Sequence, residues 1–184
     1  ARLDAGRELR REEVDLVGLL VDTVADARAA GPDHDWRLDL AVLEPPADAT
    51  ADEAEDFLPE PPLVIGDEAR LRQVIVNLLA NARVHTPAGS HVTTTLARER
   101  DTLIVRIHDD GPGIAPDVRD RLFERFARGD SSRERRTGST GLGMSIALAI
   151  VQSHGGSIDV DSSTAPEDHG TTFTVRLPAA AVEE

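Results

Sequence analysis

The sequence predicts an α+β fold: a two-layer sandwich in which one mixed, mainly antiparallel sheet carries helices on one face. Three observations support this. Residues 68–84 carry apolar side chains at the helical period of three and four. Residues 91–96 and 102–108 alternate apolar and polar side chains around a charged turn, as a β-hairpin does. A second helical pattern over 141–153 is followed by further short alternating runs.

The chain is expected to start with a connector, a helix and a strand. Residues 1–15 are charge-dense and are interpreted as the frayed end of a helix plus a connector; an ordinary N-terminal arm is the alternative. Leu16–Ala30 is amphipathic, with Asp15 as its N-cap and Gly31 as its stop. Residues 36–42 alternate like a strand.

The helix predicted over 68–84 organises the rest of the chain. An acidic, proline-rich loop over 44–62 and a short strand over 63–65 precede it. Asp67 is its predicted N-cap and Pro87 ends it.

One face of this helix carries an unusual polar row, which we call the amide stripe: Gln73, Asn77, Asn81 and His85. Residues four apart lie nearly above one another on a helix. Amide oxygens suit a hard cation such as Mg²⁺, and amide N–H groups suit phosphate oxygens. The alternative is an ordinary polar face with two chance asparagines.

The C-terminal half is expected to continue with a short helix over 116–126 and a loop over 127–140. The loop has no apolar period and is rich in arginine. Residues 141–153 then form a helix that begins at a glycine-rich turn. Strands are predicted over 157–160 and 171–177.

Composition narrows the classes of function. The 184 residues fit one domain, and a formal net charge of −14 argues against a nucleic-acid or anionic-membrane surface. All 20 basic residues are arginine, so a P-loop, which needs lysine, is excluded. Cysteine is absent, which excludes thiolate metal sites and disulfides. No run of 18 apolar residues predicts a transmembrane helix.

Two glycine-rich turns are candidates for ligand contact. Asp109 ends a predicted strand and precedes a Gly-Pro-Gly turn over 111–113, where a flat base could approach the backbone; a plain tight turn is the alternative. The turn over 138–143 opens a helix, so its N–H groups could cradle an anion; a flexible hinge is the alternative. The arginine-rich loop could close over phosphates as a lid, or could simply be solvated.

Five stretches carry a resemblance to a known family. They read NLLANARVHTP (77–87), DDGPGI (109–114), RLFERFAR (121–128), GSTGLGMSIALAIVQSHGG (138–156) and GTTF (170–173). Their order and spacing resemble the N box, first glycine box, F box, second glycine box and third glycine box of bacterial sensor histidine kinases. The chain resembles the ATP-binding catalytic domain of that family over about residues 15–178, which implies a Bergerat-type ATP fold.

The resemblance implies that the cofactor is ATP with Mg²⁺. It also implies roles for three residues of the amide stripe. Asn77 would coordinate the Mg²⁺ and Asn81 would contact phosphates or metal. His85 takes the place of an aromatic residue near adenine. Many family members carry a lysine where this chain has Val84, and Arg83 could substitute for it, although it points about 100° away. The predicted catalytic residues are therefore Asn77, Asn81 and Arg83.

The resemblance also implies an adenine pocket and a phosphate cradle. Asp109 would bind the adenine amine, supported through water by Thr171. The wall beside adenine would comprise Gly111, Gly113 and Ile114. The phosphate cradle would use the backbone of Gly141, Leu142 and Gly143, with Arg128 in a lid over 127–140. Phe123 and Phe126 would anchor the lid or dock it on a partner helix.

One substitution bears on the reaction. ATPases of the same fold place a glutamate four residues before the first asparagine of the N box, where it activates water; here that residue is Gln73, which cannot act as a base. Phosphotransfer to a histidine is therefore favoured over hydrolysis. An ATPase or chaperone-like machine, an anti-sigma serine kinase and a nucleotide-binding module without catalysis remain alternatives.

The resemblance further implies partners and a location. We expect residues 1–15 to be the end of a dimerisation and phosphoacceptor helical hairpin with its linker, and 16–184 to be the catalytic domain. The phosphoacceptor hairpin of the full-length chain and a response regulator are the expected partners. We expect the fragment to be monomeric, the full-length protein to be a homodimer, and this domain to be the cytoplasmic part of a membrane-bound bacterial sensor.

Overall fold

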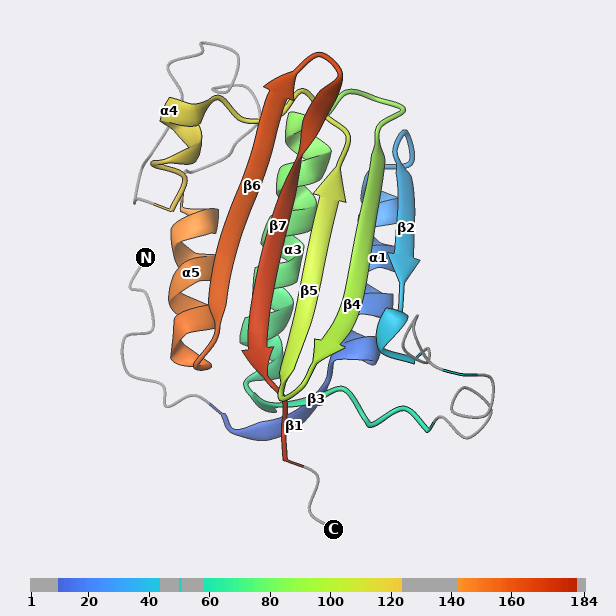
Figure 1. Ribbon diagram of the computed structural model, residues 1–184, viewed down its shortest axis with the longest axis vertical. Helices are drawn as coiled ribbons and strands as arrows, with labels where there is room; N and C mark the ends of the chain where they lie inside the picture. The colour runs from blue at the N-terminus through green and yellow to red at the C-terminus, as the bar shows by residue number, and fades with distance from the viewer. Residues whose placement is uncertain (1–9, 44–49, 51–57, 124–141, 182–184) are drawn as a thin grey trace.

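The computed structural model describes residues 10–43, 50, 58–123 and 142–181. The chain forms two layers: a five-stranded sheet, and the longer helices, which cover one of its faces (Figure 1). The predicted two-layer α+β sandwich is therefore confirmed.

The sheet is mixed and mainly antiparallel, in the strand order β2-β4-β5-β7-β6. Its strands are β2 (Asp35–Asp39), β4 (His91–Glu99), β5 (Thr102–Asp109), β6 (Ser157–Ala165) and β7 (Asp168–Pro178). Only the edge pair β2·β4 is parallel. The predicted hairpin of β4 and β5 is present. The strands β6 and β7 run further than predicted, because backbone pairing continues through polar residues that show no apolar alternation.

Three of the predicted helices form close to their predicted bounds, and the two predicted N-caps, Asp15 and Asp67, are present. Helix α1 spans Leu16–Ala30, and the Asp15 carboxylate accepts from the backbone N–H of Val17. Helix α3 spans Glu68–His85 and is capped by Asp67. Helix α5 spans Gly143–Ser153.

Three expectations about local structure were wrong. Part of the predicted connector is a strand, β1 (Glu12–Asp15), which pairs antiparallel with β3 (Leu63–Gly66). The predicted strand over 36–42 stops early, and a 3-10 turn follows at Ala41–Leu43. Helix α4 covers only Pro116–Arg119. The partner of β1 lies some fifty residues away, so no local pattern could predict it. The predicted loop and helix segments over 44–49, 51–57 and 124–140 lie outside the described residues.

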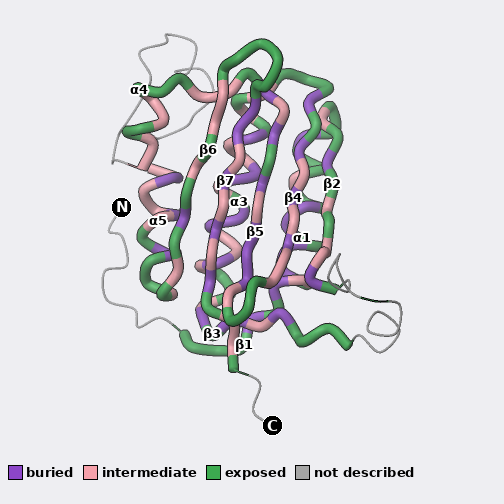
Figure 2. Tube along the Cα trace, in the orientation of Figure 1, coloured by how far each residue is buried: buried purple, intermediate pink, exposed green. Residues whose placement is uncertain are grey.

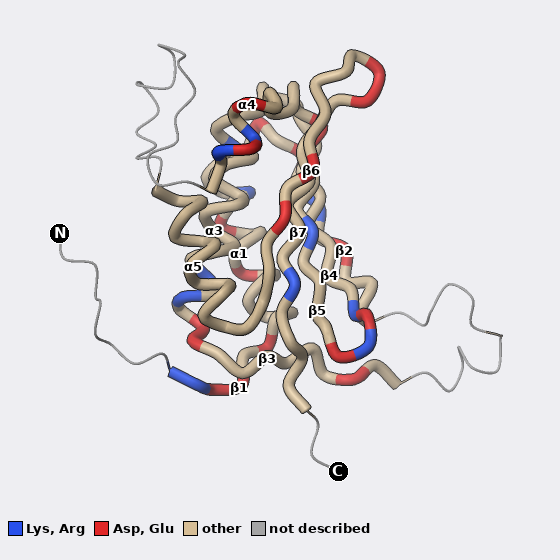
Figure 3. Tube along the Cα trace, turned by 60° about the vertical axis from the view of Figure 1, so that its left-hand side comes forward, with Lys and Arg blue, Asp and Glu red and all other residues tan. Residues whose placement is uncertain are grey.

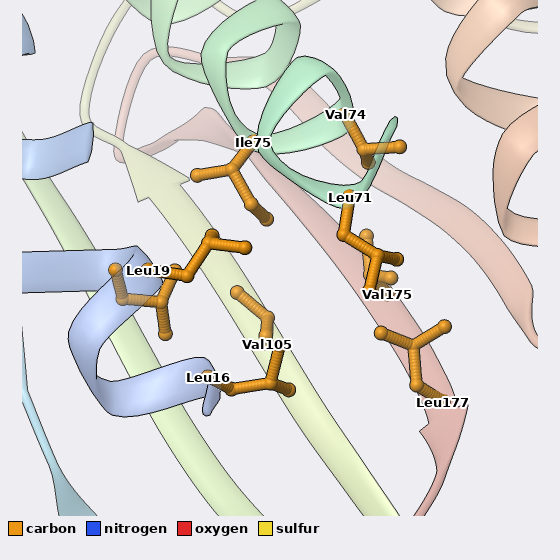
Figure 4. A pocket seen from close by; sticks show the side chains of 9 residues that line it. Leu16, Leu19, Leu71, Val74, Ile75, Val105, Val175 and Leu177 are labelled. Carbon is orange, nitrogen blue, oxygen red and sulfur yellow. The ribbon is translucent and has the colours of Figure 1, made fainter. Parts of the chain in front are cut away.

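The core lies between the sheet and the helices, and buried residues recur along α1, α3, α5 and the central strands (Figure 2). A cavity of about 10 Å³ remains in this layer, between α1, α3, β5 and β7 (Figure 4). Its lining is entirely apolar and includes Leu19, Val74 and Val105. Because no polar group faces it, we regard it as a dry packing gap and not as a ligand site.

One buried hydroxyl in this core costs stability. Thr94 in β4 is 1% exposed, and its Oγ1 has no hydrogen-bond partner in the described structure. Valine has nearly the same shape without the hydroxyl, so we expect Thr94→Val to stabilise the domain by about 1 kcal/mol. Urea unfolding monitored by circular dichroism measures the change. An equal or lower unfolding midpoint at unchanged slope would contradict the assignment of an unsatisfied hydroxyl.

None of the helices within the described ranges is both long enough and apolar enough to cross a membrane.

Candidate functional site

Asn77, in the middle of the amide stripe of α3, lies at the start of α5. The side-chain nitrogen of Asn77 donates a hydrogen bond to the backbone carbonyl of Gly143, 3.1 Å away. Its side-chain oxygen receives no hydrogen bond from the described residues, and the same holds for the amide of Asn81. Both side chains are partly exposed. An unpaired amide oxygen of this kind is suited to a hard cation.

The start of helix α5 has no side-chain N-cap within the described residues. Leu142 occupies the N-cap position and makes no side-chain capping bond. The first N–H groups of a helix have no partner within the helix and carry partial positive charge. The backbone at Leu142 and Gly143 is therefore suited to an anion, directly beside Asn77.

A buried carboxylate ends strand β5. Asp109 is 5% exposed, and its Oδ1 accepts from the backbone N–H of Gly111 at 3.1 Å. Burial raises the pKa of Asp109, and the opposing effects of the Gly111 N–H, His108 and His85 are smaller. A carboxylate held at this energetic disadvantage is characteristic of functional sites.

The turn after Asp109 is clamped against the β6–β7 hairpin. Gly113 has a φ of 76°, and a Cβ there would collide with the backbone carbonyl of Ser163. The backbone N–H of Ile114 donates to Ser162 Oγ at 2.8 Å. Only glycine fits at position 113, because both the left-handed backbone and the close approach exclude a side chain.

Sequence reasoning missed two residues that hold this turn. Ser162 Oγ donates to the carbonyl of Gly170 and lies 2.9 Å from Thr171 Oγ1. His169 Nδ1 donates to the carbonyl of Gly111 at 2.8 Å. Thr171 itself is 4% exposed and is the cross-strand partner of Asp109. Nothing near Ser162 or His169 in the sequence marks them, because their partners lie in other elements.

Helix α3 joins the two halves of the site. The C-terminal end of α3 lies beside the Asp109 carboxylate. Its C-cap Thr86 packs against Gly111, where a Cβ would meet Thr86 side-chain atoms. His85, the last residue of the helix, interacts electrostatically with Asp109. The middle of α3 lies beside the start of α5, where Asn77 bonds the carbonyl of Gly143 and the helix N-terminus suits an anion. The eight steps along the helix from Asn77 to His85 rise about 12 Å. This spacing is comparable with the length of an extended nucleoside triphosphate.

The structure does not bring every candidate residue to this site. The stem of Arg83 lies against Gly31 at the end of α1, where a Cβ would be 2.8 Å from Arg83 Cδ. Its prediction as a catalytic residue is not supported by this position, because Arg83 lies about 200° around the helix from Asn81. Phe123 packs against the core cluster. The predictions for Arg128, Gly141 and Phe126 lie outside the described residues.

The described part of the chain mixes residues of both charges, and acidic residues occupy the tip of the β6–β7 hairpin (Figure 3). Positive potential for an anion must therefore come from backbone N–H groups, metal or individual arginines, since the chain has no lysine.

Comparison with protein families gives a match over residues 66–181 to the family described as histidine kinase-, DNA gyrase B-, and HSP90-like ATPase. The matched range contains the whole candidate site.

Curated relatives cover nearly the whole chain. A probable sensor histidine kinase, TcrY, from Mycobacterium tuberculosis is 49% identical over 178 residues, which is 97% of this chain and 33% of TcrY. The sensor histidine kinase TrcS from the same organism is 37% identical, over 97% of this chain and 32% of TrcS. The chain thus spans about a third of the length of these relatives.

Solved structures share the fold. The mycobacterial sensor histidine kinase MprB aligns with a TM-score of 0.74 at 28% identity, covering 93% of this chain and 100% of that one. Full-length ShkA in complex with AMPPNP aligns with a TM-score of 0.73 at 26% identity, covering 97% of this chain and 33% of that one.

Proposed function

Because the chain belongs to the family of histidine kinase-, DNA gyrase B- and HSP90-like ATPases, as the ATP-binding catalytic domain of a sensor histidine kinase, we propose that it binds ATP with Mg²⁺ between α3, the turn after Asp109 and the start of α5. In this proposal it transfers the γ-phosphoryl group to a histidine on a separate helical hairpin. The single observation that carries it is the placement of one helix, α3: its C-cap Thr86 lies against Gly111 in the turn after Asp109, and its Asn77 bonds the start of α5.

The adenine end of the proposed site is Asp109. Its ionised carboxylate accepts a hydrogen bond from the exocyclic amine, and Thr171 supports it from the neighbouring strand. The walls are Gly111, Gly113 and Ile114, whose backbone is held by Ser162 and His169. His85 lies at the same end and favours the ionised form of Asp109.

The phosphate end of the proposed site is formed by Asn77, Asn81 and the backbone from Gly141 to Gly143. The oxygen of Asn77, which accepts no hydrogen bond from the described residues, fits Mg²⁺, while the nitrogen of the same amide holds α5 in place through Gly143. When bound, Mg²⁺ neutralises charge on the phosphate oxygens. The chain's own contribution is to position the nucleotide and to offer N–H donors to it, and Arg128 in the proposed lid adds a positive charge.

The wider assembly is also a proposal. We assign residues 1–15 to the end of the phosphoacceptor hairpin and its linker, and 16–184 to the catalytic domain. The partners are that hairpin, in a homodimeric full-length protein, and a response regulator that receives the phosphoryl group. We place the domain on the cytoplasmic side of a membrane-bound bacterial sensor, and the isolated fragment is a monomer.

We expect the 184-residue chain to bind ATP in the presence of Mg²⁺ without phosphorylating itself. None of its six histidines lies on a helix before an acidic residue, which is the setting of the family's phosphoacceptor. Calorimetric titration measures the binding, and γ-labelled ATP measures the transfer. Label on the isolated chain, or no ATP binding at all, would contradict the proposal. A hairpin carrying the phosphoacceptor histidine, added in trans, should become labelled.

A further inference from the structure

His154 joins the end of α5 to the beginning of α3. Its Nδ1 donates to the carbonyl of Ile150 at 2.8 Å, and its Nε2 accepts from the backbone N–H of Asp67 at 3.0 Å. A backbone N–H can only donate and a carbonyl can only accept, so both bonds together define the neutral tautomer with the proton on Nδ1. Each ring nitrogen is thus committed to a different helix.

The start of α3 is built to receive this ring. Asp67 is the N-cap, and its own N–H needs an acceptor that a glutamate or glutamine three residues later usually provides. That residue is Arg70 here, whose N–H instead donates to the Asp67 carboxylate at 3.1 Å. Gly66 leaves room for the imidazole: a Cβ there would lie 2.7 Å from His154 Nε2. His154 therefore replaces an acceptor that α3 lacks.

The two helices are consequently tied at both ends of α5. The N-terminal tie is the bond from Asn77 to the carbonyl of Gly143, and the C-terminal tie is the bond from Asp67 to His154. Between them, apolar residues such as Ala147 and Val151 pack into the core. Apolar packing is non-directional, whereas two hydrogen bonds about 15 Å apart define how far one helix can slide or tilt along the other.

We propose that His154 is a positioning residue for the phosphate end of the site. By holding the far end of α5 against the start of α3, it sets where Leu142 and Gly143, at the near end of α5, stand relative to Asn77. It does not contact the nucleotide. This inference rests on the proposed function, since it takes the phosphate chain of a nucleotide as the ligand of the backbone at Leu142 and Gly143.

Two variants separate the two bonds of His154. In His154→Gln the side-chain oxygen can reach the position of Nε2 and still accept from Asp67. In His154→Asn the amide can occupy the position of Nδ1 but is too short to reach Asp67. Ser153→Ala is the matched control, because Ser153 lies at the same helix end and bonds only locally, to Ile150 and the neighbouring ring.

We expect His154→Asn to weaken ADP and ATP binding by about 10-fold, the equivalent of one net hydrogen bond. Adenosine binding should stay within about 2-fold, because adenosine uses the Asp109 end. His154→Gln and Ser153→Ala should retain ADP affinity within about 3-fold. Calorimetry measures the affinities, and hydrogen exchange at the Asp67 amide reports the bond directly, with faster exchange expected only in His154→Asn.

Equal ADP affinity of wild type and His154→Asn, with faster exchange at Asp67, would overturn the inference alone. An equal loss of adenosine and ADP affinity would also overturn it, because it would indicate general damage to the fold. Failure of the wild-type chain to bind ATP would remove the proposed function and this inference together, and the exchange data would still report whether the bond forms.

Discussion

Replacing Asp109 with asparagine is expected to lower the affinity for ATP by about 100-fold or more. The carboxylate is buried at the end of β5 and is the proposed acceptor for the adenine amine. Asparagine is nearly isosteric with aspartate, and its side-chain oxygen can still accept from the Gly111 N–H. It removes the negative charge, however, and its amide N–H groups would face the adenine amine, which is itself a donor. The loss of a hydrogen bond to a buried charged group costs about 3 kcal/mol, which corresponds to this change in affinity. Calorimetric titration with ATP measures it.

A matched control and a base analogue sharpen this test. Asp110→Asn alters the adjacent carboxylate, which bonds His91 at the surface, and should leave affinity unchanged. Inosine triphosphate carries a carbonyl where adenine carries its amine, so Asp109→Asn should bind it no worse than wild type does. Unchanged ATP affinity in Asp109→Asn, or an equal loss for both nucleotides, would refute the adenine assignment.

The raised pKa of Asp109 leads us to expect opposite effects of pH on the stability of the domain and on its affinity for ATP. Burial raises the folded-state pKa of Asp109 above its ordinary value of 3.8. The folded protein therefore holds this proton more tightly, and the contribution of Asp109 to stability is lost as pH rises from 3.8 through the raised pKa. Asp109→Asn should raise the melting temperature of the nucleotide-free domain at neutral pH. ATP affinity of wild type should instead fall as pH decreases through the same window, since the ionised form binds adenine.

Replacing Asn77 with alanine is expected to remove the effect of Mg²⁺ on nucleotide binding and to slow phosphotransfer to an added hairpin by about 100-fold or more. The variant loses both the amide oxygen that suits the metal and the bond to Gly143 that holds α5. Loss of one preorganised contact to developing charge typically costs this much in rate. The measurements are ATP affinity with and without Mg²⁺, and label transfer in trans.

Two comparisons distinguish this loss from general damage. Adenosine affinity should be unchanged in Asn77→Ala, because the Asp109 end is intact. Val76→Ala changes the next residue along α3, whose side chain is 43% exposed, and should behave as wild type. If Asn77→Ala keeps the full Mg²⁺ dependence of ATP binding, the metal assignment is wrong.

Some of the candidate site could be read from the sequence because its signals are local. The amide stripe follows from a four-residue spacing on one helix, and Asp109 with Gly111 and Gly113 follows from consecutive positions at a strand end. Arg83 shows the limit of such reasoning. Arg83 is next to Val84, the position where many family members have lysine, and is therefore its predicted substitute. Neighbouring residues on a helix point about 100° apart, and in the structure the stem of Arg83 lies against Gly31.

The sequence by itself determined the fold class, the limits of α1 and α3, the caps Asp15 and Asp67, and the residue types that suit a nucleotide, because periodicity and capping act within a few residues. Only the tertiary structure decided the pairing of β1 with β3, the clamping of the Asp109 turn by Ser162 and His169, and the bond from Asp67 to His154. These contacts join residues about 50 to 90 positions apart. Their existence depends on how the layers pack, which no short stretch of sequence encodes.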